Sequence, residues 1–295
     1  MSALARYFKA GGKNVAGYDR TVTSLTNELT AEGIDIHFTD SPELIPEFIT
    51  KNPPESSLII YTPAIPKEQK ELAWFRGNGF SLKKRSEVLG MLTKDKFTIA
   101  VAGTHGKTTT SSMIAHLLKA SGLNVSAFLG GISKNYRTNL LMADKQGQTE
   151  IVVVEADEYD RSFLTLFPDI AVITSMDADH LDIYGDKKYL EDSYRLFAKQ
   201  VKPGGKLIFK KGLPLEDIET GKSMYALDQQ ADYAGDSIRI KDHLYHFNWH
   251  NHKGSIADVS SAMPGRHNVE NAVAAIAVAR MMNISDVAIR TSFAS

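Results

Sequence analysis

Cysteine is absent from the 295 residues of this sequence. Its absence excludes a disulfide scaffold and a cysteine-ligated zinc site, and it is compatible with a reducing compartment. An excess of charge of one sign is also lacking, because 34 lysines and arginines face 35 acidic residues and the formal net charge is −1. There is therefore no global basic field that would favour nucleic acid or an anionic membrane surface.

Long hydrophobic runs are missing as well. No apolar stretch approaches the roughly 20 residues of a membrane-spanning helix, and the first residues lack the apolar core of a signal peptide. The 43% of hydrophobic and 23% of charged residues are typical of a globular protein. We therefore expect a cytoplasmic protein with no nucleic-acid partner and no membrane insertion, long enough for two domains.

The first third of the chain alternates helices and strands, and it begins with a helix. Helices are predicted over residues 2–10, 23–32, 67–78 and 86–93, and strands over residues 14–19, 34–38 and 57–61. A Rossmann-like sheet should instead start with a strand and a glycine-rich turn. We therefore expect a truncated Rossmann-like domain over residues 1–94, in which Met1 is an internal methionine of a longer protein.

The remainder predicts a second α/β domain over residues 95–295. Strands are predicted over residues 97–102, 124–129, 149–155, 170–174 and 206–210, and helices over residues 188–200 and 268–282. This alternation predicts a mainly parallel sheet of phosphate-loop type flanked by helices. Residues 225–263 are predicted to form an antiparallel extension of short strands, and residues 288–293 show no evident end of the fold.

The segment Gly103-Thr-His-Gly-Lys-Thr-Thr-Thr110 stands between a buried strand and an apolar helical face. A glycine-containing turn that leads into a helix presents backbone N–H groups and the positive end of the helix dipole to phosphates. Lys107 can then reach the β- and γ-phosphates, and the Thr108 hydroxyl can ligate magnesium. The usual pattern has glycine where this chain has Val101, so a purely structural turn is the alternative. The residues predicted to bind ATP at this loop are Gly103, Thr104, His105, Gly106, Lys107, Thr108 and Thr109.

Acidic residues follow the apolar strand that ends at Glu155. Carboxylates at the C-terminal edge of a parallel sheet, beside a phosphate loop, suit Mg²⁺, which prefers hard oxygen ligands. Glu155 is the predicted ligand because it is nearest to the strand end. A solvated acidic loop is the alternative.

Two further segments carry polar groups after apolar elements. His180 follows a predicted strand together with Asp177, Asp179 and Asp182, where it could ligate a second metal ion, orient a carboxylate or be structural. Asn268 and Asn271 lie three residues apart in the first turn of a predicted helix, so they share one face. Their amides could match an adenine edge, or they could be a helix cap and a surface residue.

Four histidines, at positions 243, 246, 250 and 252, suggest a metal site at first sight. The surrounding residues alternate in polarity, as in a hairpin. Neighbouring strand positions face opposite ways, so we expect these histidines not to converge.

Together these segments resemble the Mur ligase family, the ATP-dependent amide-bond ligases of peptidoglycan synthesis. The resemblance covers essentially the whole chain, and its most specific parts are the loop Gly103–Thr110, the string Glu155-Ala-Asp-Glu158 and the segment that begins at Gly265. Within the family the chain resembles the branch that adds L-alanine to UDP-N-acetylmuramate. The resemblance implies ATP and Mg²⁺, these two substrates, and an acyl-phosphate intermediate that the amine of L-alanine attacks.

The resemblance also implies roles for individual residues. Lys107 would stabilise the transferring phosphoryl group, Thr108 and Glu155 would hold one Mg²⁺, and Glu155 with His180 would hold a second. The remaining residues would bind the two nucleotides and the sugar substrate: His267, Asn268 and Asn271 for adenine, Asp19, Thr62 and Ala64 for the UDP part, and Asp157 and Ser162 for further substrate contacts.

The chain departs from the family pattern in two ways. Many members carry a carbamylated lysine where this chain has Arg195, and the alanine-adding branch usually lacks that lysine. The glycine-rich UDP loop should precede Met1 and a C-terminal domain should follow Ser295, so we expect this chain alone to be a fragment with little or no ligase activity. A murein tripeptide recycling ligase, a non-catalytic nucleotide-binding module and a small-metabolite kinase remain alternatives.

Overall fold

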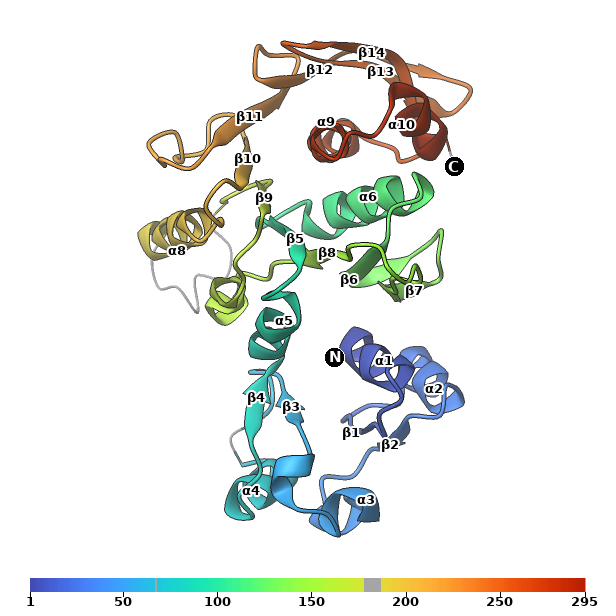
Figure 1. Ribbon diagram of the computed structural model, residues 1–295, viewed down its shortest axis with the longest axis vertical. Coiled ribbons are helices and arrows are strands. Elements are labelled where there is room, and N and C mark those ends of the chain that lie inside the picture. The colour runs from blue at the N-terminus through green and yellow to red at the C-terminus, as the bar shows by residue number, and fades with distance from the viewer. Residues whose placement is uncertain (67, 178–186, 295) are drawn as a thin grey trace. The chain divides into compact units, whose positions relative to one another are not determined.

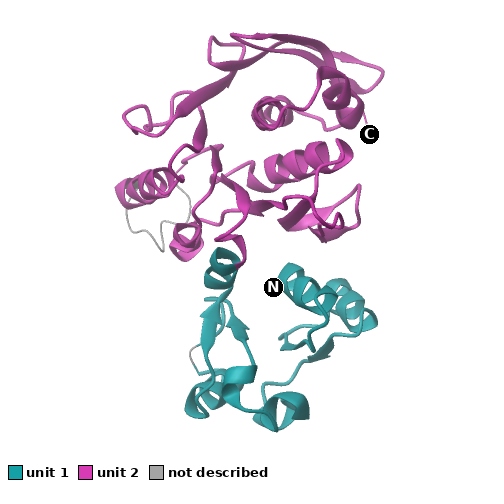
Figure 2. Cartoon of the chain, in the orientation of Figure 1, with its two compact units in different colours: residues 1–91 teal, residues 92–295 magenta. Residues whose placement is uncertain are grey.

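A computed structural model describes residues 1–66, 68–177 and 187–294, and it is shown in Figure 1. The chain forms two compact units, residues 1–91 and 92–295 (Figure 2). Domains with the bounds 1–94 and 95–295 stay a prediction. Among the described residues, no helix has both the length and the apolar character needed to cross a membrane.

The first unit contains two small parallel strand pairs. Strand β1 (Ala16–Tyr18) pairs with β2 (Asp35–His37), and β3 (Ile59–Tyr61) pairs with β4 (Leu82–Lys84). Thr23 and Thr26 form a reciprocal capping box at the start of α2, which explains why that helix begins where it does. The helical elements of this part are α1 (Ser2–Ala10), α2 (Ser24–Ala31), η1 (Pro42–Leu44), α3 (Glu47–Thr50), η2 (Pro54–Ser56), α4 (Lys70–Gly77) and α5 (Arg85–Thr93), the last of which runs past residue 91.

The second unit is built on one ten-stranded sheet with the order β14-β13-β12-β11-β10-β9-β5-β8-β6-β7. Its centre is parallel, because β5 lies between β8 and β9 and pairs in parallel with both. The bounds of this central group are β5 (Phe97–Ala102), β6 (Val125–Ser133), β8 (Ile151–Glu155), β9 (Ile170–Ile173) and β10 (Lys206–Lys210). Strands β5, β8 and β9 are nearly continuous apolar runs, since both of their faces are covered. The predicted α/β fold class is confirmed.

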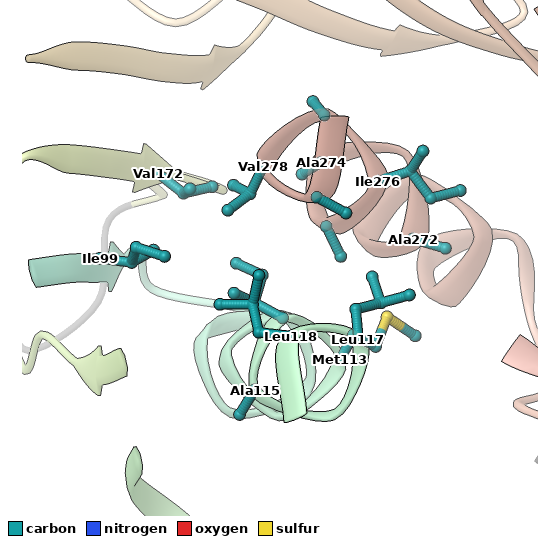
Figure 3. Close-up of a cluster of buried hydrophobic side chains, with 14 of the residues drawn as sticks. Ile99, Met113, Ala115, Leu117, Leu118, Val172, Ala272, Ala274, Ile276 and Val278 are labelled. Carbon is teal, nitrogen blue, oxygen red and sulfur yellow. The ribbon is translucent and has the colours of Figure 1, made fainter. Parts of the chain in front are cut away.

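Helices α6 (Lys107–Ala120) and α9 (Arg266–Met281) pack against each other on one face of this sheet. Figure 3 shows Leu117 and Met113 of α6 near Ile276 of α9, with Ile99 and Val172 contributed by the sheet. Most of α9 is buried, and its run of alanines and valines lets two helix backbones approach closely. This pair of helices forms the core behind the loop that precedes α6.

The helical elements η3 (Tyr159–Thr165) and α8 (Lys187–Lys199) lie on the other side of β5 and β9 from α6, as Figure 1 shows. Fully buried Phe163 of η3 stacks on Phe197 of α8, with ring centroids 5.1 Å apart. Tyr194 contacts the same ring edge-on at 5.2 Å. The aromatic cluster anchors the segment that follows β8.

The predicted antiparallel extension is only partly antiparallel. Strands β12 (Tyr233–Lys241), β13 (Leu244–Asn251) and β14 (Gly254–Ser261) form an antiparallel meander, but β11 (Lys222–Leu227) pairs with β12 in parallel. Only the first residues of β12 pair with β11, from Tyr225↔Tyr233 to Leu227↔Gly235. Between β11 and β12 the chain therefore has to return along the strand direction by only about two residues, or roughly 7 Å, which a short loop can span.

Two of the clustered histidines bind different partners. His246 lies 2.8 Å from Asp258, whereas the nearest acid of His250 is Asp236 at 3.7 Å. Within the described parts of the chain, no three acidic or histidine side chains gather as a metal site. The elements that were not predicted include β7 (Thr138–Leu141), which pairs with β6, and α10 (Asp286–Phe293), which Ser285 caps.

Candidate nucleotide-binding site

The loop between β5 and α6 depends on two glycines with positive φ. Gly103 has φ +142°, and a Cβ atom there would lie 2.1 Å from Oγ1 of Thr174 and 2.9 Å from the backbone N of Ser175. Gly106 has φ +82° and stands at the N-cap of α6. These positions allow the loop to turn tightly and point the first N–H groups of α6 outward, the arrangement that favours anions.

Two side chains at the end of β9, Thr174 and Ser175, form hydrogen bonds to this loop. The Thr174 hydroxyl donates to the carbonyl oxygens of Ala102 and His105. The Ser175 hydroxyl accepts from the backbone N–H of His105 at 2.7 Å and lies 2.9 Å from the Thr104 hydroxyl. These two supports were not predicted from the sequence, although the Thr-Ser pair at the tip of a buried strand was a usable signal.

Lys107 is folded back over the loop. Its Nζ donates to the carbonyl oxygen of Gly103 at 2.6 Å and to Oε1 of Glu158 at 2.8 Å. The Glu158 side chain is only 1% exposed. Burial raises the pKa of the Glu158 carboxyl, and the hydrogen bond from Lys107 partly opposes that effect. Glu158 was recognised as part of an acidic string, but no role was predicted for it.

Glu155 ends β8 beside two glycines of β6. Its Oε2 accepts from the backbone N–H of Gly130 at 3.0 Å, and a Cβ on Gly130 would lie 2.4 Å from both carboxylate oxygens. A Cβ on the next residue, Gly131, would lie 3.3 Å from Cγ2 of the exposed Thr108. The glycine pair therefore leaves room for the two predicted magnesium ligands that the structure describes. This glycine pair was not predicted from the sequence.

One of the two asparagines of α9, Asn271, lies beside the loop. A Cβ on Gly106 would lie 2.7 Å from Oδ1 of Asn271, so this amide packs directly against the loop. Asn268 is buried and donates from Nδ2 to the carbonyl oxygen of Pro264 at 2.6 Å. His267 is exposed, with its ring beside Gly265. Contact with adenine stays a prediction for all three residues.

The other predicted residues of the second unit have the following positions. His180, Asp179 and Asp182 lie outside the described residues. Asp157 accepts from the backbone N–H of Tyr159 at 3.1 Å, and Ser162 lies within η3. Arg195 donates to the carbonyl oxygen of Pro214 at 2.6 Å and pairs with Asp217.

In the first unit, Asp19 follows β1 and accepts from the backbone N–H of Thr21 at 3.0 Å. Thr62 follows β3, where its carbonyl oxygen accepts from Ile65 at 3.1 Å. Ala64 lies in the same turn and is exposed. The predicted UDP contacts of these three residues remain predictions.

A mainly parallel sheet whose central strand leads through a two-glycine loop into a helix defines an α/β protein of phosphate-loop type. The chain belongs to the Mur ligase family. The Mur ligase middle domain matches residues 101–279, and the domain described as the catalytic domain of the Mur ligase family matches residues 1–97.

Individual relatives agree with this assignment. The chain is 47% identical to UDP-N-acetylmuramate–L-alanine ligase of Porphyromonas gingivalis, over 100% of this chain and 64% of that protein. The chain therefore spans less than two thirds of the length of this curated relative.

Two solved structures share the fold. The UDP-N-acetylmuramate–alanine ligase of Thermotoga maritima has a TM-score of 0.85 at 24% identity, over 99% of this chain and 65% of that one. The UDP-N-acetylmuramate:L-alanyl-γ-D-glutamyl-meso-diaminopimelate ligase of Neisseria meningitides has a TM-score of 0.86 at 22% identity, over 99% of this chain and 93% of that one.

Proposed function

We propose that the protein containing this chain joins L-alanine to UDP-N-acetylmuramate, at the expense of ATP, in the cytoplasmic synthesis of peptidoglycan precursors. The observation that carries the proposal is 47% identity, along the whole of this chain, to a curated ligase of that name. The geometry of the loop supports it, since Lys107, Glu155 and Thr108 lie around one glycine-lined site.

In this proposal ATP transfers its γ-phosphoryl group to the substrate carboxylate, and the amine of L-alanine then displaces phosphate from the acyl phosphate. The N–H groups at the start of α6 bind phosphate oxygens, and Lys107 stabilises their negative charge. The Thr108 hydroxyl and the Glu155 carboxylate are hard oxygen donors of the kind Mg²⁺ prefers, and a bound Mg²⁺ would neutralise charge on the phosphates.

The two predicted domains divide the substrates in this proposal. Residues 95–295 bind ATP, with His267, Asn268 and Asn271 near the adenine and with His180 as a second metal ligand. Residues 1–94 bind the UDP part through Asp19, Thr62 and Ala64. Asp157 and Ser162, which follow Glu155 in the chain after the end of β8, contact the sugar substrate.

The test uses the full-length protein and measures phosphate release from ATP with UDP-N-acetylmuramate and either L-alanine or the tripeptide L-alanyl-γ-D-glutamyl-meso-diaminopimelate. We expect release only with L-alanine, and loss of at least about 100-fold in rate for Glu155→Gln. Release with the tripeptide would instead support a recycling ligase. ATP binding without release in either case would support a nucleotide-binding module, and a phosphorylated product formed without any amine would support a kinase.

The 295-residue chain by itself is expected to bind ATP without catalysing ligation, because it spans only 64% of the length of its relative. Phosphate release by this chain that depends on L-alanine would contradict that expectation.

A further inference from the structure

The ammonium group of Lys107 is surrounded by oxygen atoms of the protein itself. Nζ donates to Gly103 O at 2.6 Å, to Glu158 Oε1 at 2.8 Å and more weakly to Thr104 O at 3.5 Å. An ammonium group has three N–H donors, so these acceptors use all of them. A phosphate that takes Lys107 as its partner therefore has to replace or share one of these oxygens.

Glu158 is the acceptor that competes most strongly with a phosphate. It is the only charged one of the three, and charge-assisted hydrogen bonds are stronger than neutral ones. The Glu158 side chain is 1% exposed and that of Lys107 14% exposed, so solvent screens the pair poorly. A phosphate at Lys107 would also stand beside a carboxylate of the same sign, and the two would repel each other.

The backbone around Glu158 is held firmly. Ala156 extends the pairing of β8 by donating from its N–H to Val101 O at 2.9 Å, and Arg161 N–H donates to Glu158 O at 2.9 Å. Asp160 and Arg161 both have left-handed φ values, 51° and 54°, which are uncommon for residues other than glycine. Such a conformation persists only where the surrounding structure enforces it. The carboxylate is thus presented to Lys107 by a tightly constrained turn.

We propose that Glu158 is a positioning residue that holds the Lys107 ammonium over the loop and yields it to the phosphates of ATP. The pair sets the resting position of the lysine and lowers the affinity of the site for triphosphate. This inference rests on the proposed ATP site.

The test compares Glu158→Gln with the wild-type chain by calorimetric titration with ATP and, separately, with adenosine. Glutamine keeps the size and one acceptor but removes the negative charge. We expect ATP to bind about tenfold more tightly, because a repulsive carboxylate beside the phosphates is gone. Adenosine has no phosphates, so its affinity should not change.

Glu150→Gln is the matched control. It removes a carboxylate that also pairs with a lysine, Lys96, at 2.7 Å. We expect this variant to bind ATP like the wild type. Unchanged or weaker ATP binding by Glu158→Gln, or an equal change in adenosine binding, would overturn the proposal.

A second measurement uses the wild-type chain and does not depend on the folding of the glutamine variant. Glutamate side chains are labelled with ¹³C at the carboxyl, and the Glu158 signal is assigned by its loss in Glu158→Asp. Saturation with ATP should shift this signal, because the carboxylate loses its ammonium partner. An unshifted signal would contradict the proposal. If the folded wild-type chain bound no ATP, the proposed ATP site itself would be wrong, and this inference would fail with it.

Discussion

At the scale of single residues, the glycines of the phosphate loop and beside it leave room for groups that a Cβ atom would displace. Gly103 occupies a place that no other residue fits, since a Cβ would overlap both a side chain and the backbone of the neighbouring strand end. Gly147 also has positive φ, +77°, but no atom lies within 4 Å of its Cβ position. A comparison of alanine substitutions at the two positions therefore distinguishes the cost of backbone strain from the cost of steric overlap.

Gly103→Ala should therefore lower the free energy of unfolding by about 3 kcal/mol or more, because strain and overlap add. Gly147→Ala should cost about 1 kcal/mol from strain alone. Urea unfolding followed by circular dichroism measures both. Equal losses for the two variants would show that crowding by Thr174 and Ser175 is not what requires glycine.

A second prediction concerns the carboxylate of Glu155. Gly130→Ala would place a methyl group on its oxygen atoms, and the side chain would have to swing away from the site. We expect ATP affinity in the presence of Mg²⁺ to fall about tenfold, with little change in its absence, because a ligand of the ion is displaced. Gly77→Ala is the control, since nothing lies within 4 Å of that Cβ. An equal loss with and without Mg²⁺ would argue against Glu155 as a ligand.

At the scale of elements, α9 is the helix on which the core behind the loop depends. Ile276 is 0% exposed, whereas Ile240 in β12 is 66% exposed. Ile276→Ala should cost about 2–5 kcal/mol of unfolding free energy through lost burial and a cavity, and Ile240→Ala less than about 0.5 kcal/mol. Denaturant titration compares the two. A cost below 1 kcal/mol at Ile276 would mean that α6 and α9 repack freely.

The elements also show where prediction from sequence succeeds. Strands β5, β8 and β9 are continuous apolar runs, and the amphipathic pattern of α8 is strong, so local periodicity identified them. Strand β7 and helix η3 have no such pattern. Strand β7 exists because it pairs with β6, and η3 because Phe163 packs against two aromatic rings of α8. The parallel direction of the β11–β12 pair is likewise not encoded in the polarity pattern of either strand.

At the scale of the whole molecule, the two compact units carry separate binding tasks in the proposed function. Residues 95–295 produced alone should fold and bind ATP within about threefold of the affinity of the whole chain, because a compact unit of this size can hold its own core. Thermal unfolding and calorimetry test this. A fragment that unfolds, or that loses ATP binding while folded, would mean that the predicted boundary is wrong.

The sequence by itself determined the class of the protein. Apolar runs of strand length, a Gly-Lys-Thr turn between a strand and a helix, and acids after a later strand are local features that can be identified without a structure. Only the tertiary structure decided which groups meet at that turn: Glu158 on Lys107, Ser175 on His105, and Asn271 against Gly106. These contacts join segments that are far apart in the chain and adjacent only in the sheet and its helices. Their geometry depends on strand order and packing, which local periodicity does not encode.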